Sequence, residues 1–371
     1  MRIQQTLGLL LIGALLPAQD GTDTVVKQDG ASIRGVSVTT LTLTSVKFLR
    51  NKEEVELPPH QVTDIQWGGV PDAFASGLAA MARNDYETAR VQLGEAINKT
   101  DRPLLKAEAR LLQGKAAVQA GSADPAAAAN AAGALRAWIG EFPDHWRLPE
   151  AMWLLGRGLR LGQAPADAET ALKELDERAG RDGWGAVWNA RAKYELPLCL
   201  LAQNKALDAR GAFQSAGSAA DTAMAAVGGK SEELATLKVN SKVGEGESLV
   251  HEKAYDRAAE FFRTLSQSDD LSLAAAGKAG QGEAMFLLAA ASNDALALRN
   301  AEVALAEACV LDTGTGDTAA KAGYYLGRVV TTLGDRAGAD WGARSKAYYQ
   351  TVVKGYPGSR WVGPAKAELA K

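Results

Sequence analysis

The pattern of apolar residues along the chain changes near residue 70. Before it, short runs of β-branched residues alternate with polar ones at a period of two, which is typical of half-buried strands. Turn residues separate the runs: Asp29-Gly30 predicts a tight hairpin, Gly35 a bulge, and Pro58-Pro59 a break in the ladder. The sequence therefore predicts about five short strands in an all-β module over residues 19–70. They are drawn from the runs 24–26, 36–38, 41–43, 46–48, 55–57 and 62–67.

The size and spacing of this module resemble a small barrel of the SH3 or Sm type. Short β modules of this kind often precede repeat domains in exported bacterial proteins. The resemblance implies a cell-wall or polysaccharide ligand, so an adaptor that acts through residues 19–70 is one alternative for the function. A core this small is marginal on its own, and we expect it to pack on the first helices or on a partner.

After a hinge at residues 68–72, apolar residues recur at helical spacing. Hydrophobic residues make up 47% of the chain but aromatic ones only 6%, so alanine, the best helix former, carries much of the apolar content. One frame recurs: a small residue in a first helix (A), a turn, and then alanine, a large apolar residue and alanine in a second helix (B). The small residue lets the two helices approach, and the large residue fills the gap between them. In the best copies Gly77, Pro197 and Gly246 are followed by Leu93, Phe213 and Phe262.

The small position occurs seven times, at intervals of 36 to 49 residues, at 77, 114, 156, 197, 246, 282 and 327. With this frame and a period near 34 residues, the chain resembles the tetratricopeptide-repeat (TPR) family. The resemblance implies a mainly α fold, a tetratricopeptide-like α-α superhelix (solenoid) over residues 72–371, preceded by a small all-β module. We expect seven helix pairs over residues 72–356 and a closing helix over 363–370. The alternative is a helical bundle without repeats, whose alanines recur through composition alone.

The N-terminus has the three parts of an export signal. Arg2 precedes an apolar run over residues 7–16, and Pro17-Ala18 offers a cleavage site, so residues 1–18 are predicted to be a signal peptide. The apolar run is too short to span a membrane, which takes about 20 residues. No cysteine lies near the cleavage site, which argues against a lipid anchor. We therefore expect a periplasmic or secreted protein.

Two proline-terminated segments, 141–144 and 355–361, resemble the repeat ends of periplasmic TPR proteins that serve outer-membrane assembly and the Tol envelope-division system. This implies a role in organising or assembling the cell envelope. The outer-membrane assembly lipoprotein carries an anchor cysteine that this chain lacks.

Charge and reactive residues narrow the function further. Lysine and arginine number 41 against 44 acidic residues, a net charge of −3, so we expect no nucleic-acid partner. Cys199 and Cys309 stand alone in apolar stretches and are expected to be buried free thiols. The three histidines share no metal-ligand spacing, and His145 and His251 are expected in solvated turns. We predict no metal and no cofactor.

The string from Cys309 to Gly314 is the one enzyme-like motif, because an apolar run leading into Asp312-Thr313-Gly314 is similar to the active-site turn of aspartic proteases. Those enzymes use two aspartates that share a proton. The second half of the motif is missing and the flanks are alanine-rich, so a repeat turn is the preferred interpretation and a hydrolase using Asp312 the alternative.

Eight tryptophans remain to be placed. Trp184 and Trp188 are four residues apart and are expected on one helix face. Trp138, Trp146 and Trp153 crowd the second and third repeats. Packing between helices is the preferred role, and an exposed pair is the alternative, because tryptophan often anchors binding partners.

The TPR resemblance implies that A helices line a concave groove in which a protein or peptide binds. Projected onto this sequence, the groove-facing positions are Lys115, Trp153, Arg157, Arg160, Glu247, Glu283, Tyr324 and Arg328. The earlier positions are basic and suit a carboxylate terminus or an acidic peptide, whereas Glu247 and Glu283 make a later stretch acidic. The alternative is a solvated charged face. The sequence thus predicts an exported, non-enzymatic scaffold that binds a protein or peptide partner.

Overall fold

The computed structural model describes residues 22–121, 124–312, 316–356 and 358–371. The expected signal peptide, residues 1–18, lies outside this part of the chain. The chain divides into two compact units: residues 1–116 with 137–148, and residues 117–136 with 149–371. Within the described ranges, no helix has the length and apolar character that crossing a membrane requires.

The first unit contains a five-stranded antiparallel sheet, in the order β4-β3-β2-β1-β5. The number of strands is as predicted. The predicted runs 36–38 and 41–43 are not separate strands, however, because the first lies inside one long strand that ends at Leu41. The strands are β1 (Asp23–Lys27), β2 (Ser32–Leu41), β3 (Val46–Arg50), β4 (Glu53–Leu57) and β5 (Val62–Gln66).

The predicted turn residues act as expected. Gly30 closes the β1–β2 hairpin with a φ of 82°. Gly35, with a φ of 73°, is the extra residue of a bulge, because Asp23 pairs with Val36 and Thr24 with Arg34. Between β4 and β5 the two prolines lead into a 3-10 helix, η2 (Pro59–Gln61).

The small sheet does not build a core alone. Buried strand residues such as Val25, Val36 and Phe48 share one cluster with Phe74 and Leu105 of the first helices, which confirms the expected packing. A buried ion pair adds to this contact within the unit: the carboxylate of Asp23 accepts hydrogen bonds from two backbone amides and pairs with Arg102 at 2.7 Å. His145 is also buried in this unit, against the expectation of a solvated turn, and burial, followed by the charge of Arg147, lowers its pKa to about 4.

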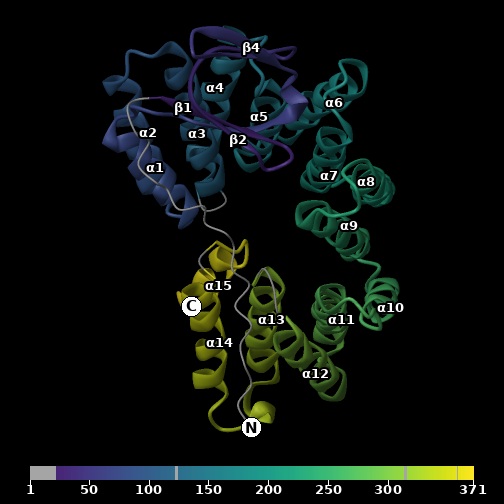
Figure 1. Cartoon of the computed structure of the whole chain (residues 1–371). Helices are drawn as coiled ribbons and strands as arrows, with labels where there is room; N and C mark the ends of the chain where they lie inside the picture. Colours follow the sequence, from purple (N-terminus) through teal and green to yellow (C-terminus); the bar gives the residue numbers. More distant parts are fainter. Residues whose placement is uncertain (1–21, 122–123, 313–315, 357) are drawn as a thin grey trace, which may run out of the picture. The chain divides into compact units, whose positions relative to one another are not determined.

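Seven helix pairs and a closing helix follow the sheet along the chain, and this confirms the predicted fold class (Figure 1). The odd-numbered helices α1 to α13 are the A helices, and the even-numbered helices α2 to α14 are the B helices. In order they are α1 (Asp72–Ala82), α2 (Tyr86–Lys99), α3 (Pro103–Ala120), α4 (Pro125–Glu141), α5 (Leu148–Leu161), α6 (Pro165–Arg181), α7 (Ala186–Ala202), α8 (Ala206–Ala226), α9 (Glu232–His251), α10 (Tyr255–Leu265), α11 (Leu271–Ser292), α12 (Ala295–Leu311), α13 (Asp317–Leu333), α14 (Trp341–Gly355) and α15 (Val362–Leu369), with a 3-10 turn η3 (Gly334–Ala337) after α13.

The glycine frame is the steric contact that the sequence predicts. A Cβ atom built on the A-helix glycine would lie only 2.4–2.7 Å from a large side chain of the paired B helix. Only glycine permits this approach, so the pairing of small and large residues fixes the distance between the helices. The contacts are Gly77 with Leu93, Gly156 with Leu172, Gly246 with Phe262, Gly282 with Leu305 and Gly327 with Tyr349.

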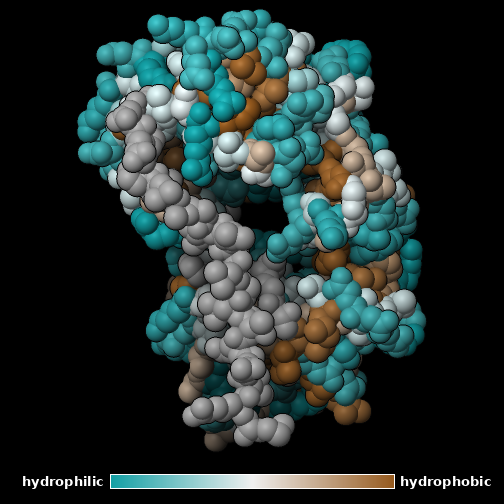
Figure 2. All heavy atoms as spheres, in the orientation of Figure 1, coloured by the Kyte–Doolittle hydropathy of each residue, from teal (hydrophilic) through white to brown (hydrophobic). Residues whose placement is uncertain are grey.

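In the second unit the B helices α8, α10 and α12 each pack on their own A helix and on the A helix that follows. The A helices also contact one another directly, α7 with α9, α9 with α11 and α11 with α13, so they form a continuous layer. The opposite layer is not wholly polar: α12 exposes Leu296, Val303 and Val310 at seven-residue intervals. Figure 2 shows apolar side chains gathered where Figure 1 places α11 and α12.

The turn between A and B helices recurrently contains a left-handed residue that is not glycine. The φ angles lie between 53° and 64° at Asn84, Gln163, Asn204, Lys253 and Asn293. Asparagine adopts this conformation readily, whereas a longer side chain is strained in it.

Replacing Lys253 with asparagine is therefore expected to raise the free energy of unfolding by about 0.5–1 kcal/mol. The reciprocal change, Asn204→Lys, is expected to lower it by a similar amount. Chemical denaturation followed by far-UV circular dichroism measures both. Equal stability of the two variants would contradict the strain argument.

Candidate partner-binding surface

The predicted groove residues all lie on A helices. Lys115 is on α3 and belongs to the first unit. The other seven lie in the second unit, on α5, α9, α11 and α13, where the structure brings them into two clusters. The first cluster surrounds Trp153 and the second surrounds Glu247.

The first cluster is less basic than the sequence suggested, because α7 supplies a buried carboxylate. Glu195 accepts hydrogen bonds from Arg160 at 2.9 and 3.1 Å and lies 3.0 Å from the Nε atom of Arg157. The two arginines therefore share one buried acid, which neutralises half of their charge. Burial raises the pKa of the neighbouring Tyr194.

Trp153 is the centre of an aromatic–guanidinium stack. The guanidinium carbon of Arg157 lies 4.8 Å from the centroid of its ring and that of Arg191 lies 5.5 Å away, while Arg191 also covers Trp188 at 4.2 Å. Arg191 donates two parallel hydrogen bonds, of 2.6 and 2.7 Å, to Glu233 at the start of α9. A pocket of about 420 Å³ opens here, lined by Trp153, Arg157, Arg191, Tyr194, Glu195, Glu232, Glu233, Thr236 and Leu237.

The expected pairing of Trp184 with Trp188 on one helix face is wrong. Trp184 precedes α7, which begins after Gly185, and both Gly183 and Gly185 have positive φ angles that a continuing helix excludes. The ring of Trp184 lies instead under Arg178 at 4.6 Å. Only Trp188 of the two belongs to the stack around Trp153.

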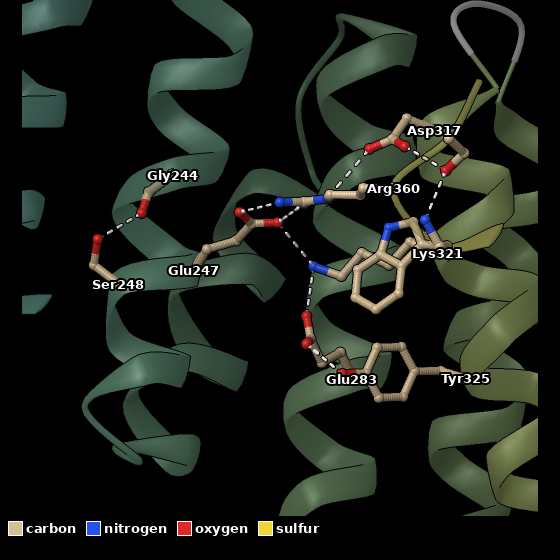
Figure 3. Close-up of polar contacts among 10 residues, drawn as sticks. Gly244, Glu247, Ser248, Glu283, Asp317, Lys321, Tyr325 and Arg360 are labelled. Carbon is tan, nitrogen blue, oxygen red and sulfur yellow. Dashed lines mark hydrogen bonds and ion pairs between the residues drawn. The ribbon is translucent and has the colours of Figure 1, made fainter. Parts of the chain in front are cut away.

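The second cluster is an ion network around a buried lysine, Lys321 of α13 (Figure 3). Its Nζ atom lies 2.5 Å from Glu283 Oε2 and 3.3 Å from Glu247 Oε1. Tyr325 donates a hydrogen bond of 2.6 Å to the other oxygen of Glu283. Arg360, from the C-terminal segment, forms a bidentate pair with Glu247.

Lys321 and Glu247 are each held in the charged form by the opposite charges around them. Burial opposes the charge on Lys321, but the carboxylates of Glu283 and Glu247 raise its pKa above the usual 10.5. Burial likewise opposes the charge on Glu247, and the charges of Arg360 and Lys321 nevertheless lower its pKa to about 2. The acidic stretch expected at Glu247 and Glu283 is therefore compensated from within the chain.

Aromatic rings close one side of this cluster. Trp361 stacks on Tyr324 at 5.3 Å between centroids and meets Tyr325 edge-on at 5.5 Å. Tyr324, expected to face the groove, is therefore buried, and Arg328 donates a hydrogen bond of 3.0 Å to its hydroxyl. A pocket of about 250 Å³ remains, lined by Glu247, Val250, His251, Glu283, Arg360, Trp361 and Pro364.

Four residues central to these clusters were missed by sequence reasoning: Arg191, Glu195, Lys321 and Arg360. Two of them carried a signal. Glu195 lies two residues before Pro197, which held the small position of its frame, and Lys321 interrupts an apolar run of α13. A charged residue on the packed face of a helix pair is expected to have a buried partner.

The enzyme-like motif lies in a helix–helix turn. Asp312 is the C-cap residue that follows α12, and it accepts a hydrogen bond of 2.9 Å from the amide of Ala319 in α13, so its flanks are helices and not the strands of a protease. Thr313 and Gly314 lie outside the described residues. Among the described residues no group of three or more histidine, cysteine or acidic side chains is arranged to hold a metal. Cys199 is buried as expected, whereas Cys309 is exposed, because it faces away from the packed side of α12.

Comparison with known proteins gives partial likenesses only. No family model and no curated protein matches the chain. Among solved structures, a Rap protein complexed with competence and sporulation factor is 16% identical, with a TM-score of 0.45 over 76% of this chain and 75% of its own. The apo form of RapI is 13% identical (TM-score 0.48, 81% and 86%), and NprR in complex with its cognate peptide NprX is 12% identical (TM-score 0.46, 81% and 82%). The assignment of the fold therefore rests on the helix pairs and their glycine contacts.

Proposed function

We propose that this protein is a non-enzymatic binding protein that holds a protein or peptide segment against the A-helix layer of residues 149–371. One observation carries the proposal. The pocket between α5, α7 and α9 presents a tryptophan flanked by two guanidinium groups. Tryptophan and arginine dominate binding energy at interfaces, and helix layers of this kind present long surfaces to extended partners.

The chemistry of the pocket favours a segment with an acidic residue beside an apolar one. Arg191 is held by Glu233, whose side chain is 45% exposed, so a carboxylate of the partner can replace it in the same two-pronged geometry. Leu237 and the ring of Trp153 offer apolar contacts next to that arginine. Glu195 is buried and stays with Arg157 and Arg160, which keeps the wall of the pocket fixed when Glu233 is displaced.

Export and a role in the cell envelope are part of the same proposal. Export is supported by Arg2, the apolar run at residues 7–16 and the cleavage site at Pro17-Ala18. The envelope role is supported by the resemblance of segments 141–144 and 355–361 to the repeat ends of periplasmic TPR proteins. The strand order and the 3-10 turn before β5 are compatible with a small barrel of the SH3 type in the first unit. To test this, the protein is crosslinked in its native cell fraction, isolated and analysed by mass spectrometry. The measurement determines the N-terminus of the mature chain and identifies the crosslinked partner.

We expect crosslinks to the partner to concentrate on α5, α7 and α9. With the identified segment in a fluorescence-anisotropy titration, Trp153→Ala and Arg191→Ala are each expected to weaken binding by about tenfold or more, because hot-spot truncations cost 1.4 kcal/mol or more. Trp184→Ala is the matched control, since this tryptophan also packs on an arginine but lies outside the pocket. Equal binding by Trp153→Ala and Trp184→Ala, or crosslinks confined to other surfaces, would sink the proposal.

A further inference from the structure

The C-terminal segment of the chain crosses the A-helix layer. Arg360 reaches Glu247 of α9, which is 113 residues away in sequence, and it lies 3.6 Å from Asp317 at the start of α13. Trp361 covers Tyr324 and Tyr325 of α13. The segment thus contacts the same layer to which the proposed function assigns a partner, but at the second cluster and not at Trp153 (Figure 3).

The second cluster requires a cation from outside the helix layer. Glu247 and Glu283 are 13% and 8% exposed, and Lys321, at 6%, supplies a single positive charge between them. Without Arg360 the helices present two buried carboxylates to one ammonium group, and an uncompensated buried charge is costly. A guanidinium fits this place better than a second ammonium, because its fork bonds both oxygens of Glu247.

Arg360 can be displaced from this site more easily than the residues that form the site. The side chain of Arg360 is 52% exposed, whereas that of Glu247, with which it forms the bidentate pair, is 13% exposed. A Cβ atom built on Gly358, two residues before Arg360, would have no atom within 4 Å, so the space beside the backbone there is open. The pocket of about 250 Å³ continues beside Arg360 and Trp361 and leaves room for a longer ligand.

We propose that the surface formed by Glu247, Glu283 and Tyr324 is a binding site for an arginine followed by an aromatic residue. The chain's own Arg360-Trp361 fills this site as an internal ligand. A partner segment with the same pair of side chains displaces it. The inference rests on the proposed use of the A-helix layer for binding and adds a second, self-occupied site to it.

The test uses the full chain and a labelled peptide of residues 355–363, Gly-Tyr-Pro-Gly-Ser-Arg-Trp-Val-Gly. The substitution Arg360→Ala removes the guanidinium group that pairs with Glu247. We expect this variant to bind the peptide at least about tenfold more tightly than the wild-type chain does. The reason is that the apparent affinity is proportional to the fraction of molecules whose site is open, and the substitution raises that fraction. Arg263→Ala is the matched control: its arginine is 50% exposed and also pairs with a glutamate, Glu260, but outside the site. A peptide with alanine in place of its arginine is expected to bind none of the three proteins.

A second measurement uses the wild-type chain and does not depend on how well the variant folds. Saturating peptide is expected to accelerate amide hydrogen exchange in α15, because that helix is released together with Arg360. Peptide binding with unchanged exchange in α15, or equal affinity of Arg360→Ala and Arg263→Ala, would overturn the inference. If partner binding still depends on Trp153 in that case, the proposed function stands and only the internal ligand is refuted.

Discussion

Replacing Lys321 with alanine is expected to lower the local free energy of unfolding around α11 and α13 by about 3–5 kcal/mol, the cost of removing one partner from a buried ion pair. Lys321 is the cation that α13 places between Glu247 and Glu283. In the variant, Arg360 still pairs with Glu247, but the loss of Lys321 leaves Glu283 buried without a compensating charge. Native-state hydrogen exchange measures the change, and amides of α1 and α2 in the other unit serve as an internal reference.

Three comparisons test the explanation for this loss. Lys238→Ala breaks an exposed pair with Asp221 and is expected to cost less than about 1 kcal/mol. Adding Glu283→Gln to Lys321→Ala removes the stranded charge and is expected to recover part of the stability. Acid also narrows part of the difference in stability between wild type and variant. Although burial opposes its charge, Arg360 and, after it, Lys321 lower the pKa of Glu247 to about 2 in the folded state, against 4.5 ordinarily. Its contribution to stability is complete above pH 4.5 and disappears as the pH falls to 2. A loss no larger than that of Lys238→Ala would refute the buried-charge argument.

Phe262→Ala is expected to destabilise the second unit by about 3–5 kcal/mol through the cavity that it leaves. The ring is fully buried between two A helices. A Cβ built on Gly246 of α9 would lie 2.4 Å from the ring, and one built on Gly280 of α11 would lie 2.5 Å from it. Its neighbour Phe261 is only partly buried, so Phe261→Ala is the matched control with a smaller expected loss.

A double-mutant cycle separates this fit from general hydrophobicity. Gly246→Ala alone is expected to cost about 1–3 kcal/mol, because its methyl group overlaps the ring of Phe262. In the Phe262→Ala background the same methyl group enters the vacated space, so the double variant should be more stable than the sum of the single losses by about 1 kcal/mol. Chemical denaturation of the four proteins measures the coupling. Strict additivity would show that the two residues do not pack as described.

The helix pairs could be predicted because their determinant is local and steric. The small residue and the large one that it contacts are sixteen residues apart in the first frame, Gly77 with Leu93, and the same interval separates Gly246 from Phe262. A contact within one helix hairpin leaves a readable spacing in the sequence. The bulge at Gly35 was predictable for a similar reason, since the conformation it requires is a property of a single residue.

The candidate site was predictable only in part, because its charges are paired across helices. The frame placed Arg157, Arg160, Glu247 and Glu283 on A helices correctly. Their partners come from other repeats: Glu195 is 35 residues from Arg160, and Arg360 is 113 residues from Glu247. No fixed spacing links such pairs, so a basic and an acidic stretch were expected where the structure contains nearly neutral clusters.

The tie between Glu247 and Arg360 also bears on how the second unit folds. In a repeat array each unit senses only its neighbours, and stability adds up as in a one-dimensional chain of coupled units. Here α9 is joined to a segment beyond α14, so the pairs between them are enclosed in a loop of 113 residues. Closing that loop carries an entropic cost that grows with the logarithm of the loop length. The ion pair between Glu247 and Arg360 therefore forms only after the intervening helices are in place. The helix pairs from α9 to α14 are therefore expected to unfold cooperatively, whereas a simple repeat array would lose its terminal repeats first.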